Sequence, residues 1–138
     1  MENRDFVLRP VGRVESSLTD RASAPKQGDE GAPTARIVFS PAFREAVRDL
    51  RAGDEILVLT WLHQGVRDVL SVHPRGDTSR PITGVFATRS PDRPNPIGLH
   101  PVRIEAIEDD AITVSGLEAI QDTPVLDIKP RLGRVNER

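Results

Sequence analysis

The segment from Gly84 to His100, GVFATRSPDRPNPIGLH, contains the side chains best suited to bind a ligand. A stretch of six residues inside this segment contains three prolines, Pro91, Pro94 and Pro96. These prolines remove three backbone donors and fix three φ angles. A loop held in nearly one shape lowers the ordering cost of binding. Arg89 and Arg93 belong to this loop, and a guanidinium group suits carboxylate or phosphate recognition. The segment therefore predicts either an anion-binding platform or a stiff connector between two strands.

Two other positions carry side chains that could transfer protons. His63 follows the strongest apolar run, beside Gln64, and could be a structural histidine or a site residue. Asp109 and Asp110 could act as a paired acid and base, but their place between two alternating runs predicts an exposed turn. We therefore keep His63 as a candidate and expect the two aspartates to face solvent.

For the remaining histidines and the single tryptophan, the sequence predicts structural positions. His73 and His100 each precede a proline, which indicates polar loop residues. Trp61 lies in the middle of an apolar run, and such tryptophans mostly belong to a core. No ligand role is assigned to these three side chains.

Several chemistries are excluded by what the sequence lacks. It has no cysteine, so it can form no disulfide, thiol nucleophile or cysteine-ligated zinc site. Three scattered histidines argue against a histidine-only site, and no metal is expected. No G-x-G-x-x-G, G-K-S/T or G-x-S-x-G motif occurs. If this protein binds a nucleotide-like cofactor, it does so outside the Rossmann framework.

Length and composition indicate one soluble domain. The sequence has 138 residues, of which 37% are apolar, enough for one modest core. No stretch approaches the roughly 20 apolar residues of a membrane span. The first ten residues, MENRDFVLRP, lack the apolar run of a signal peptide. We expect a cytoplasmic protein that does not enter a membrane.

Charge is distributed unevenly although the formal net charge is only -2. Five arginines and two aspartates lie between Arg75 and Arg103, whereas residues 104–123 carry six acids and no base. A nearly neutral protein can therefore present a basic face to phosphates, and a solvated surface patch is the alternative. The candidate phosphate contacts are Arg75, Arg80 and Arg93.

The pattern of apolar residues predicts many short strands and little helix. Strands are expected at residues 7–14, 34–39, 55–63, 66–72, 84–88, 98–108, 111–118 and 123–130. The strand at 55–63 should be central and pair with 66–72, and the Asp109-Asp110 turn should join a second hairpin. Ser40 can cap a short helix that begins at Pro41 and ends before Gly53.

These elements predict a mainly β protein, a small closed antiparallel β-barrel with one short helix. Residues 16–33 are expected to form a long polar loop, and loops of this length tend to be functional or disordered. Residues 1–130 are expected to form the single domain and residues 131–138 a C-terminal tail.

Three segments together resemble the TsaA-like family, also called TrmO. They are the proline-rich segment 84–100, the sequence GLEAIQDTPVLDIKP at 116–130 and the early APKQ at 24–27. The resemblance implies an S-adenosylmethionine-dependent methyltransferase on a small β-barrel. Its characterised members methylate N6 of threonylcarbamoyladenosine beside the tRNA anticodon, so the implied partners are tRNA and, as a homodimer, a second copy of the chain.

The resemblance also implies which residues contact the methyl donor. These cofactor-binding candidates are Pro25, Lys26, Gln27, His63, Gln64, Arg89, Leu99, Glu118, Ala119, Ile120, Gln121, Asp122 and Thr123.

The chemical groups of the donor suggest roles for some of these side chains. Arg89 or Lys26 can pair with its carboxylate. Apolar strand ends at Leu99, Ile120 and Val125 can form a slot for adenine. The acceptor amine must lose a proton, and the catalytic candidates for taking it are Asp122, Gln121 and His63. Sequence reasoning leaves the choice among these three open.

Three departures from the family pattern concern the donor site and the substrate. Lys26 replaces the arginine of the early loop, which keeps the charge but loses the bidentate fork. Gln121-Asp122 replaces Asp-Gly, so that an aspartate must form a turn that favours glycine. Members with tRNA activity often carry a further C-terminal domain, and this sequence ends at Arg138. The alternatives are another RNA or small-molecule acceptor, or a non-catalytic S-adenosylmethionine-binding module.

Overall fold

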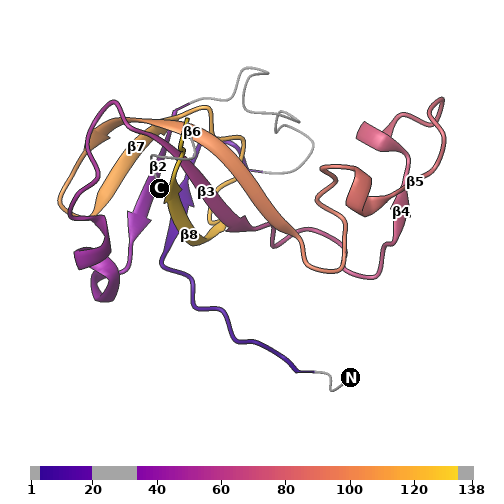
Figure 1. Ribbon diagram of the computed structural model, residues 1–138, viewed down its shortest axis with the longest axis horizontal. Helices are drawn as coiled ribbons and strands as arrows, with labels where there is room; N and C mark the ends of the chain where they lie inside the picture. Colours follow the sequence, from indigo (N-terminus) through magenta and orange to yellow (C-terminus); the bar gives the residue numbers. More distant parts are fainter. Residues whose placement is uncertain (1–3, 20–33, 134–138) are drawn as a thin grey trace.

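The fold is a six-stranded antiparallel barrel with a small lobe beside it, as the computed structural model shows for residues 4–19 and 34–133 (Figure 1). The barrel closes in the order β1-β2-β7-β6-β3-β8, while β4 and β5 form a separate two-stranded sheet in the lobe. The barrel strands are β1 (Gly12–Glu15), β2 (Ala35–Phe39), β3 (Glu55–Trp61), β6 (Ile97–Ile107), β7 (Ala111–Ser115) and β8 (Pro124–Pro130). The predicted β-barrel is therefore confirmed.

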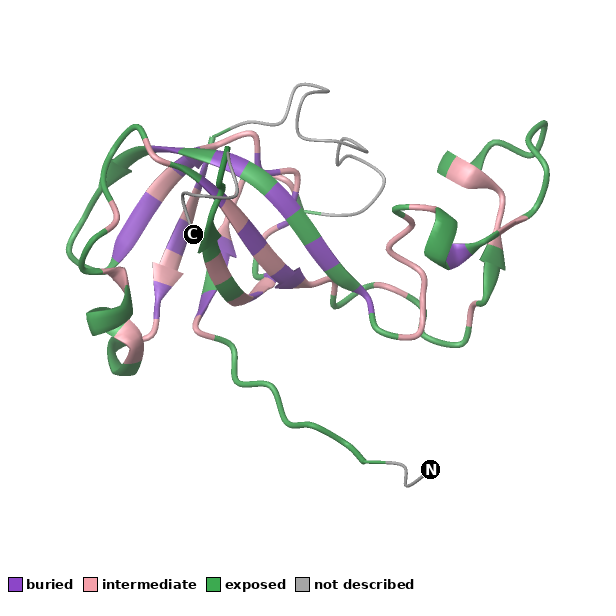
Figure 2. Ribbon diagram, viewed as in Figure 1, coloured by how far each residue is buried: buried purple, intermediate pink, exposed green. Residues whose placement is uncertain are grey.

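The barrel interior is filled by alternate residues of its strands. Along β3, the side chains of Ile56, Val58 and Thr60 are buried and their neighbours are more exposed. Figure 2 shows the same alternation along β6. A strand with period-two side chains places one set inward, and each large aliphatic side chain buried there contributes about 1.5 to 3 kcal/mol. The stability of this small core therefore comes from the burial of many aliphatic side chains rather than of a few aromatic ones.

The second predicted hairpin is present. β6 and β7 pair antiparallel around Asp109 and Asp110, and both aspartates are exposed. The register shifts between Ile104 and Ala106, a bulge that bends the long β6 strand. The expected central position of β3 is also confirmed, because β3 pairs with both β6 and β8.

The first predicted hairpin is wrong. Residues 66–72 do not pair with β3; only β4 (Ser71–Val72) is a strand, and it pairs with β5 (Thr83–Gly84). Both edges of β3 are already taken by β6 and β8, so no edge remains for a further strand. The expected strand at 84–88 is reduced to β5 and is followed by the 3-10 helix η4 (Val85–Ala87).

The ends of two other elements differ from the prediction. The first strand begins at Gly12 rather than residue 7, and residues 4–10 are exposed, because pairing with β2 and β8 begins at Gly12. The predicted helix is the 3-10 helix η2 (Pro41–Val47), and Ser40 makes no side-chain cap hydrogen bond. The helix ends at Val47, well before Gly53. The hydrogen bonds of a 3-10 helix have poorer geometry than those of an α-helix, so 3-10 helices are usually short.

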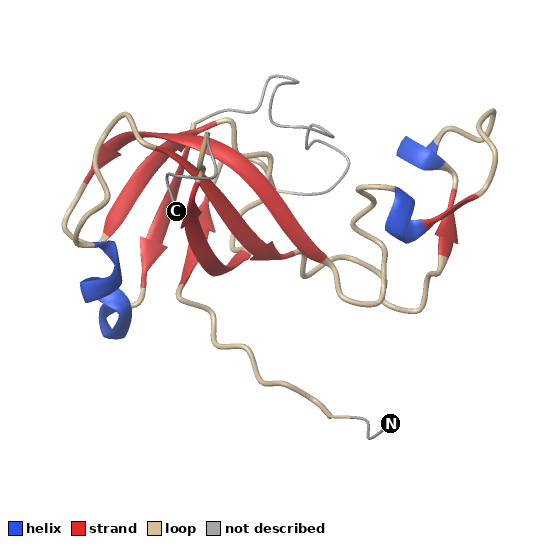
Figure 3. Ribbon diagram, viewed as in Figure 1, coloured by secondary structure: helices blue, strands red, loops and turns tan. Residues whose placement is uncertain are grey.

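The lobe consists of residues 62–96, which leave the barrel after β3 and return at β6 (Figure 3). It contains β4, β5, η4 and the 3-10 helix η3 (Pro74–Gly76). The proline-rich loop connects the end of η4 in the lobe to the start of β6 in the barrel. Within the described residues, no helix has the length and apolar character needed to cross a membrane.

Candidate functional site

A pocket of about 750 Å³ lies where the lobe meets the barrel. Its wall is formed by the turn after β3, the η3 region, the proline-rich loop, the first half of β6 and the segment that precedes β8. Segments far apart in the sequence therefore meet at this place. A concave pocket of this size suits a small-molecule ligand.

The proline-rich loop is fixed to the segment that follows β3, which belongs to the same lobe. Arg67 Nε donates to Pro94 O at 2.8 Å, Arg67 Nη2 donates to Asn95 Oδ1 at 3.1 Å, and its guanidinium lies 5.1 Å from the centroid of the Trp61 ring. Trp61 is half-buried, so the expected core tryptophan is in fact a partly exposed platform for an arginine. Asp92 Oδ1 accepts the Val66 amide at 2.9 Å. The predicted rigidity thus has a structural cause beyond the prolines.

Arg93 holds the loop together from inside. Its Nε donates to Ser90 O at 2.9 Å, and its Nη2 donates to Thr88 O at 2.6 Å and to Val85 O. One guanidinium fork thus joins three carbonyls of the loop, although Val85 O also accepts the Thr88 amide and hydroxyl. Arg93, expected to contact substrate, also lines the pocket, but its guanidinium donates these three hydrogen bonds to the backbone of the loop.

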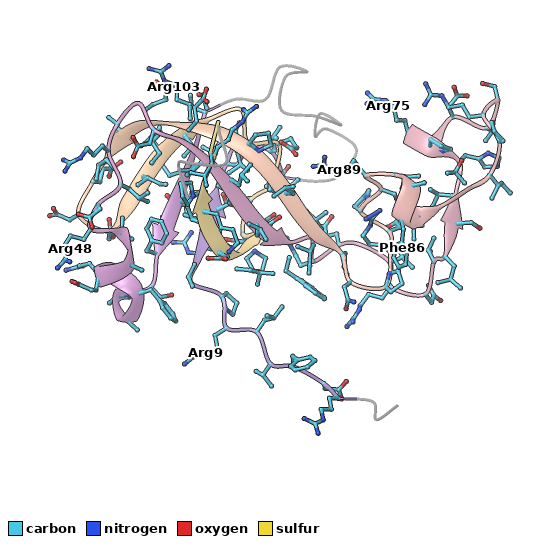
Figure 4. The ribbon with its side chains drawn as sticks, in the orientation of Figure 1. Arg9, Arg48, Arg75, Phe86, Arg89 and Arg103 are labelled. Carbon is cyan, nitrogen blue, oxygen red and sulfur yellow. The ribbon has the colours of Figure 1, made fainter. Side chains whose placement is uncertain are left out.

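Arg89 is placed differently. It is exposed, it lines the pocket, and its Nη2 donates to Leu99 O at 2.8 Å. This hydrogen bond fixes one side of the fork against β6. Figure 4 shows Arg89 and Arg75 extending from the lobe on the side that faces the barrel. The guanidinium retains further donors for an anion in the pocket.

Three hydrogen-bonded polar side chains run from the pocket wall, where Glu118 and His100 line it, into the barrel core at Thr60. His100 Nδ1 lies 2.7 Å from Glu118 Oε1, and His100 Nε2 lies 2.7 Å from Thr60 Oγ1. His100 is only 3% exposed and Thr60 is fully buried. The expectation that His100 is a polar loop residue is therefore wrong, because the side chain points into the barrel from β6. Sequence reasoning missed His100 as part of the pocket wall and Thr60 as its hydrogen-bond partner behind that wall.

The segment before β8 contains the turn that was expected to need glycine. Asp122 has a φ of 67°, in the left-handed region, and Thr123 Oγ1 donates to Ile120 O at 2.8 Å to close the turn. Gln121 points elsewhere, since its Oε1 accepts the Ser16 amide at 2.8 Å. The expected strained turn is confirmed.

The structure brings most of the predicted site residues to one pocket. Its lining includes His63, Gln64, Arg75, Arg89, Arg93, Leu99, Glu118, Ala119, Ile120 and Thr123. Four predicted residues with described positions are not in the lining, namely Arg80, Gln121, Asp122 and Val125, and Val125 is instead fully buried in the barrel core. Pro25, Lys26 and Gln27 lie outside the described residues. Within residues 4–19 and 34–133, no group of three His, Asp or Glu side chains is arranged to hold a metal ion.

The pocket combines an apolar wall with charged groups at its edge. Leu99, Ala119 and Ile120 provide the apolar surface, Arg89 provides a cation, and Glu118 provides a partly buried anion. Such a site can bind an elongated molecule that carries an apolar ring at one end and charged groups at the other. In this arrangement Arg89 can orient a charged ligand, and the carboxylate of Glu118 can accept a proton.

Comparison with known proteins gives a consistent result. The family model described as the tRNA-methyltransferase O N-terminal domain matches residues 13–136. A probable S-adenosyl-L-methionine-binding protein of Methanocaldococcus jannaschii is 47% identical over 128 residues, covering 90% of each chain. Another, from Methanothermobacter thermautotrophicus, is 42% identical over 131 residues, covering 94% of this chain and 93% of the relative.

Solved structures match the same fold. A crystal structure of TrmO from Pseudomonas aeruginosa superposes with a TM-score of 0.74 at 28% identity, covering 98% of this chain. A second crystal structure of TrmO gives a TM-score of 0.76 at 30% identity, covering 100% of this chain. The present chain spans only 61% and 62% of the length of those two chains.

Proposed function

The chain belongs to the tRNA-methyltransferase O N-terminal domain family, and on that premise we propose that it is an S-adenosylmethionine-dependent methyltransferase. The donor occupies the pocket between lobe and barrel. The observation that carries this proposal is the convergence of the rigid, arginine-bearing loop with the apolar strand ends in one pocket of about 750 Å³.

The described residues fit the groups of the donor. Leu99, Ala119 and Ile120 offer apolar contact to adenine, with backbone groups at the strand ends beside them. Arg89, held at one side by Leu99 O, pairs with the donor carboxylate. His63 and Gln64, in the turn after β3, complete the described part of the site. The family resemblance adds Pro25, Lys26 and Gln27 of the early loop.

The chemistry asks mainly for orientation. When bound, S-adenosylmethionine supplies a methyl group on a positively charged sulfur. The chain has to hold donor and acceptor in line and in near contact, and this positioning is what a stiff loop can provide. Arg67 and Arg93 serve that purpose because they fix the loop that carries Arg89. A loose loop would lose the alignment even if it retained the donor.

For the acceptor, we propose N6 of threonylcarbamoyladenosine in the tRNA anticodon loop. A single-stranded loop can present a base without the cost of opening a duplex. Arg75, exposed at the pocket edge, and Arg80, exposed farther along the lobe, supply phosphate contacts. Binding that rests on such contacts weakens steeply as salt is added, which filter binding at two salt concentrations measures. We expect an enzyme with this substrate to act in the cytoplasm.

We also propose a homodimer with the site near the subunit contact. The lobe exposes Leu70, Ile82 and Phe86, which are 72%, 66% and 85% exposed, and the segment before β1 exposes Phe6 and Val7. Exposed apolar side chains in such number favour an interaction surface. Sedimentation velocity at micromolar concentration should give a dimer, and a monomer would contradict this part of the proposal.

A second candidate, a donor-binding module without turnover, is favoured by one observation. Two relatives of which the chain covers at least 90% are named probable S-adenosyl-L-methionine-binding proteins. Calorimetry with S-adenosylmethionine tests both candidates, and mass spectrometry of tRNA nucleosides from a deletion strain separates them. Loss of the N6-methylated nucleoside supports the methyltransferase, whereas donor binding with an unchanged nucleoside profile supports the module.

A further inference from the structure

We propose that the Glu118 carboxylate accepts the proton lost by the acceptor amine during methyl transfer, and that His100 and Thr60 are positioning residues for this carboxylate. The inference rests on the proposed function, since it assigns one step of that reaction to a pocket side chain. It departs from the candidates His63, Gln121 and Asp122 that the sequence suggested, and it gives Glu118, which the resemblance implied as a donor contact, a role toward the acceptor instead.

Glu118 has the placement that a proton acceptor needs. It lines the pocket, and its side chain is 18% exposed, so the carboxylate is shielded from bulk water yet reachable. Oε1 is occupied by His100. Within residues 4–19 and 34–133, Oε2 has no hydrogen-bond partner, so one carboxylate oxygen is left for a ligand.

His100 acts through Glu118 rather than on the substrate. A carboxylate only accepts hydrogen bonds, so Nδ1 carries a proton and donates to Glu118, while Nε2 forms the hydrogen bond with the Thr60 hydroxyl. Both ring nitrogens are engaged and the ring is 3% exposed. Since Thr60 is fully buried, the chain of hydrogen bonds ends in the core and orients the carboxylate instead of conducting protons to solvent.

The other candidate acceptors in this region are less suitable. Gln121 and Asp122 do not line the pocket, and Gln121 accepts the Ser16 amide. His63 lines the pocket but lies in the turn after β3, where solvent reaches it. Asp92, the other carboxylate in the described lining, accepts the Val66 amide and so fixes the loop. Glu118 alone among these is oriented by a buried partner.

In the proposed step, the amine nitrogen uses its lone pair to form the bond to the methyl carbon while the carbon–sulfur bond breaks. That electron pair stays on sulfur, which becomes a neutral thioether. The nitrogen acquires a positive charge and loses one proton to Glu118 Oε2. The carboxylic acid later releases this proton to water. General-base groups of this kind typically contribute about 10²- to 10⁴-fold in rate.

Glu118→Gln tests the proposal with little change in shape. The control is Glu105→Gln, because Glu105 is exposed on β6, contacts Ser115 and is outside the pocket lining. Each protein, with all 138 residues, is assayed by calorimetry with S-adenosylmethionine and by single-turnover methyl transfer to tRNA that carries threonylcarbamoyladenosine. We expect Glu118→Gln to lower the rate constant at least about 100-fold with unchanged donor affinity, and Glu105→Gln to change neither.

Two separate measurements test whether His100 positions the Glu118 carboxylate. Thr60→Val is nearly isosteric and removes only the hydroxyl; we expect it to lower the rate constant by a smaller factor than Glu118→Gln, again with unchanged donor affinity. In ¹⁵N-histidine NMR of the protein without ligands, Glu118→Gln should move the Nδ1 signal of His100, because its partner loses its charge. Glu105→Gln should leave that signal in place.

Any result other than these expected ones contradicts one identifiable part of the proposal. An unchanged rate in Glu118→Gln overturns the proton-acceptor role, and a loss of donor affinity that accounts for the rate loss assigns Glu118 to donor binding instead. An unchanged His100 signal in that variant overturns the positioning contact. Wild-type protein that binds no donor, or binds it and leaves the tRNA unmethylated, overturns the proposed function and this inference with it.

Discussion

Gly98 and His100 share the inward face of β6, and a Cβ built on Gly98 would lie 2.6 Å from His100 Nε2. The same Cβ would lie 2.5 Å from Thr60 Oγ1. The glycine is therefore required because it leaves room for the hydrogen bond between Thr60 and His100. The hydrogen bonds that run from Glu118 to Thr60 therefore depend on the absence of a side chain at Gly98.

Gly98→Ala should destabilise the protein by about 1 to 3 kcal/mol. The added methyl group must separate Thr60 from His100, which leaves buried polar atoms without partners. Urea unfolding measures the change. Gly84→Ala is the matched control, because nothing lies within 4 Å of a Cβ at Gly84 and its φ is -57°. Equal effects of the two variants would show that the close approach at Gly98 has no energetic consequence.

Arg93→Ala should loosen the proline-rich loop. Three carbonyls of the loop lose a charged donor, each such hydrogen bond being worth about 1.5 to 3 kcal/mol. Hydrogen exchange should accelerate for residues 85–96 and stay unchanged in the barrel. Arg93→Lys should resemble Arg93→Ala, since one ammonium group cannot reproduce the fork.

The control for this loop is Arg80→Ala. Arg80 is exposed in the same lobe, and its Nε lies 3.8 Å from Asp77 Oδ2, a weak surface pair. We expect exchange in residues 85–96 to be unaffected by this change. If Arg93→Ala behaves in the same way, the guanidinium is not what holds the loop.

Arg89→Ala should weaken S-adenosylmethionine binding by about 1.5 to 3 kcal/mol, the range for a charged hydrogen bond. The expected rise in Kd is therefore roughly 10- to 100-fold by calorimetry. Arg103→Ala serves for comparison, because Arg103 is exposed on β6 away from the pocket lining (Figure 4). Unchanged affinity in Arg89→Ala would remove this arginine from the donor site.

Asp77 provides a prediction that depends on pH. The Ser79 hydroxyl and then the Ser79 amide donate to Asp77 Oδ1, at 2.6 and 2.9 Å, and hold the pKa of this carboxyl below its usual value. Because the folded pKa is lowered, the associated stability is present above the unfolded pKa and is lost as the pH falls through the folded pKa.

NMR titration of the Asp77 carboxyl carbon checks this directly. Ser79→Ala should raise the pKa of Asp77, whereas Ser71→Ala, at an exposed serine of β4, should not change it. A titration curve of Asp77 that is the same in all three proteins would contradict the assignment of Ser79 as the cause.

The parts of the fold that could be predicted are those that local patterns encode. A long apolar run indicated β3, alternating residues indicated the β6–β7 hairpin, and an aspartate in place of glycine indicated a left-handed residue at position 122. The partner of residues 66–72 could not be predicted, because β8 takes the second edge of β3 from far along the chain.

The candidate site was predictable to a similar degree. The family motifs placed Arg89 and Glu118 in one site, and both line the pocket. Thr60, His100 and Glu118 are brought together by three separate segments, so no spacing in the sequence reveals their hydrogen bonds. The backbone role of Arg93 was hidden for a different reason. An arginine in a loop has the same signature whether it binds carbonyls or phosphates.

Asp122 has a φ of 67° in the turn before β8, so a side chain occupies a conformation that favours glycine. An L-residue there costs about 1 to 2 kcal/mol, and an aspartate less because its side chain forms local hydrogen bonds. Asp122→Ala should therefore be about 1 kcal/mol less stable than Asp122→Gly in urea unfolding. The same pair of substitutions at Asp110, in the exposed turn after β6 and without a positive φ, should show no advantage for glycine. Equal stability of the two Asp122 variants would mean that the turn relaxes to a different conformation once the aspartate is removed.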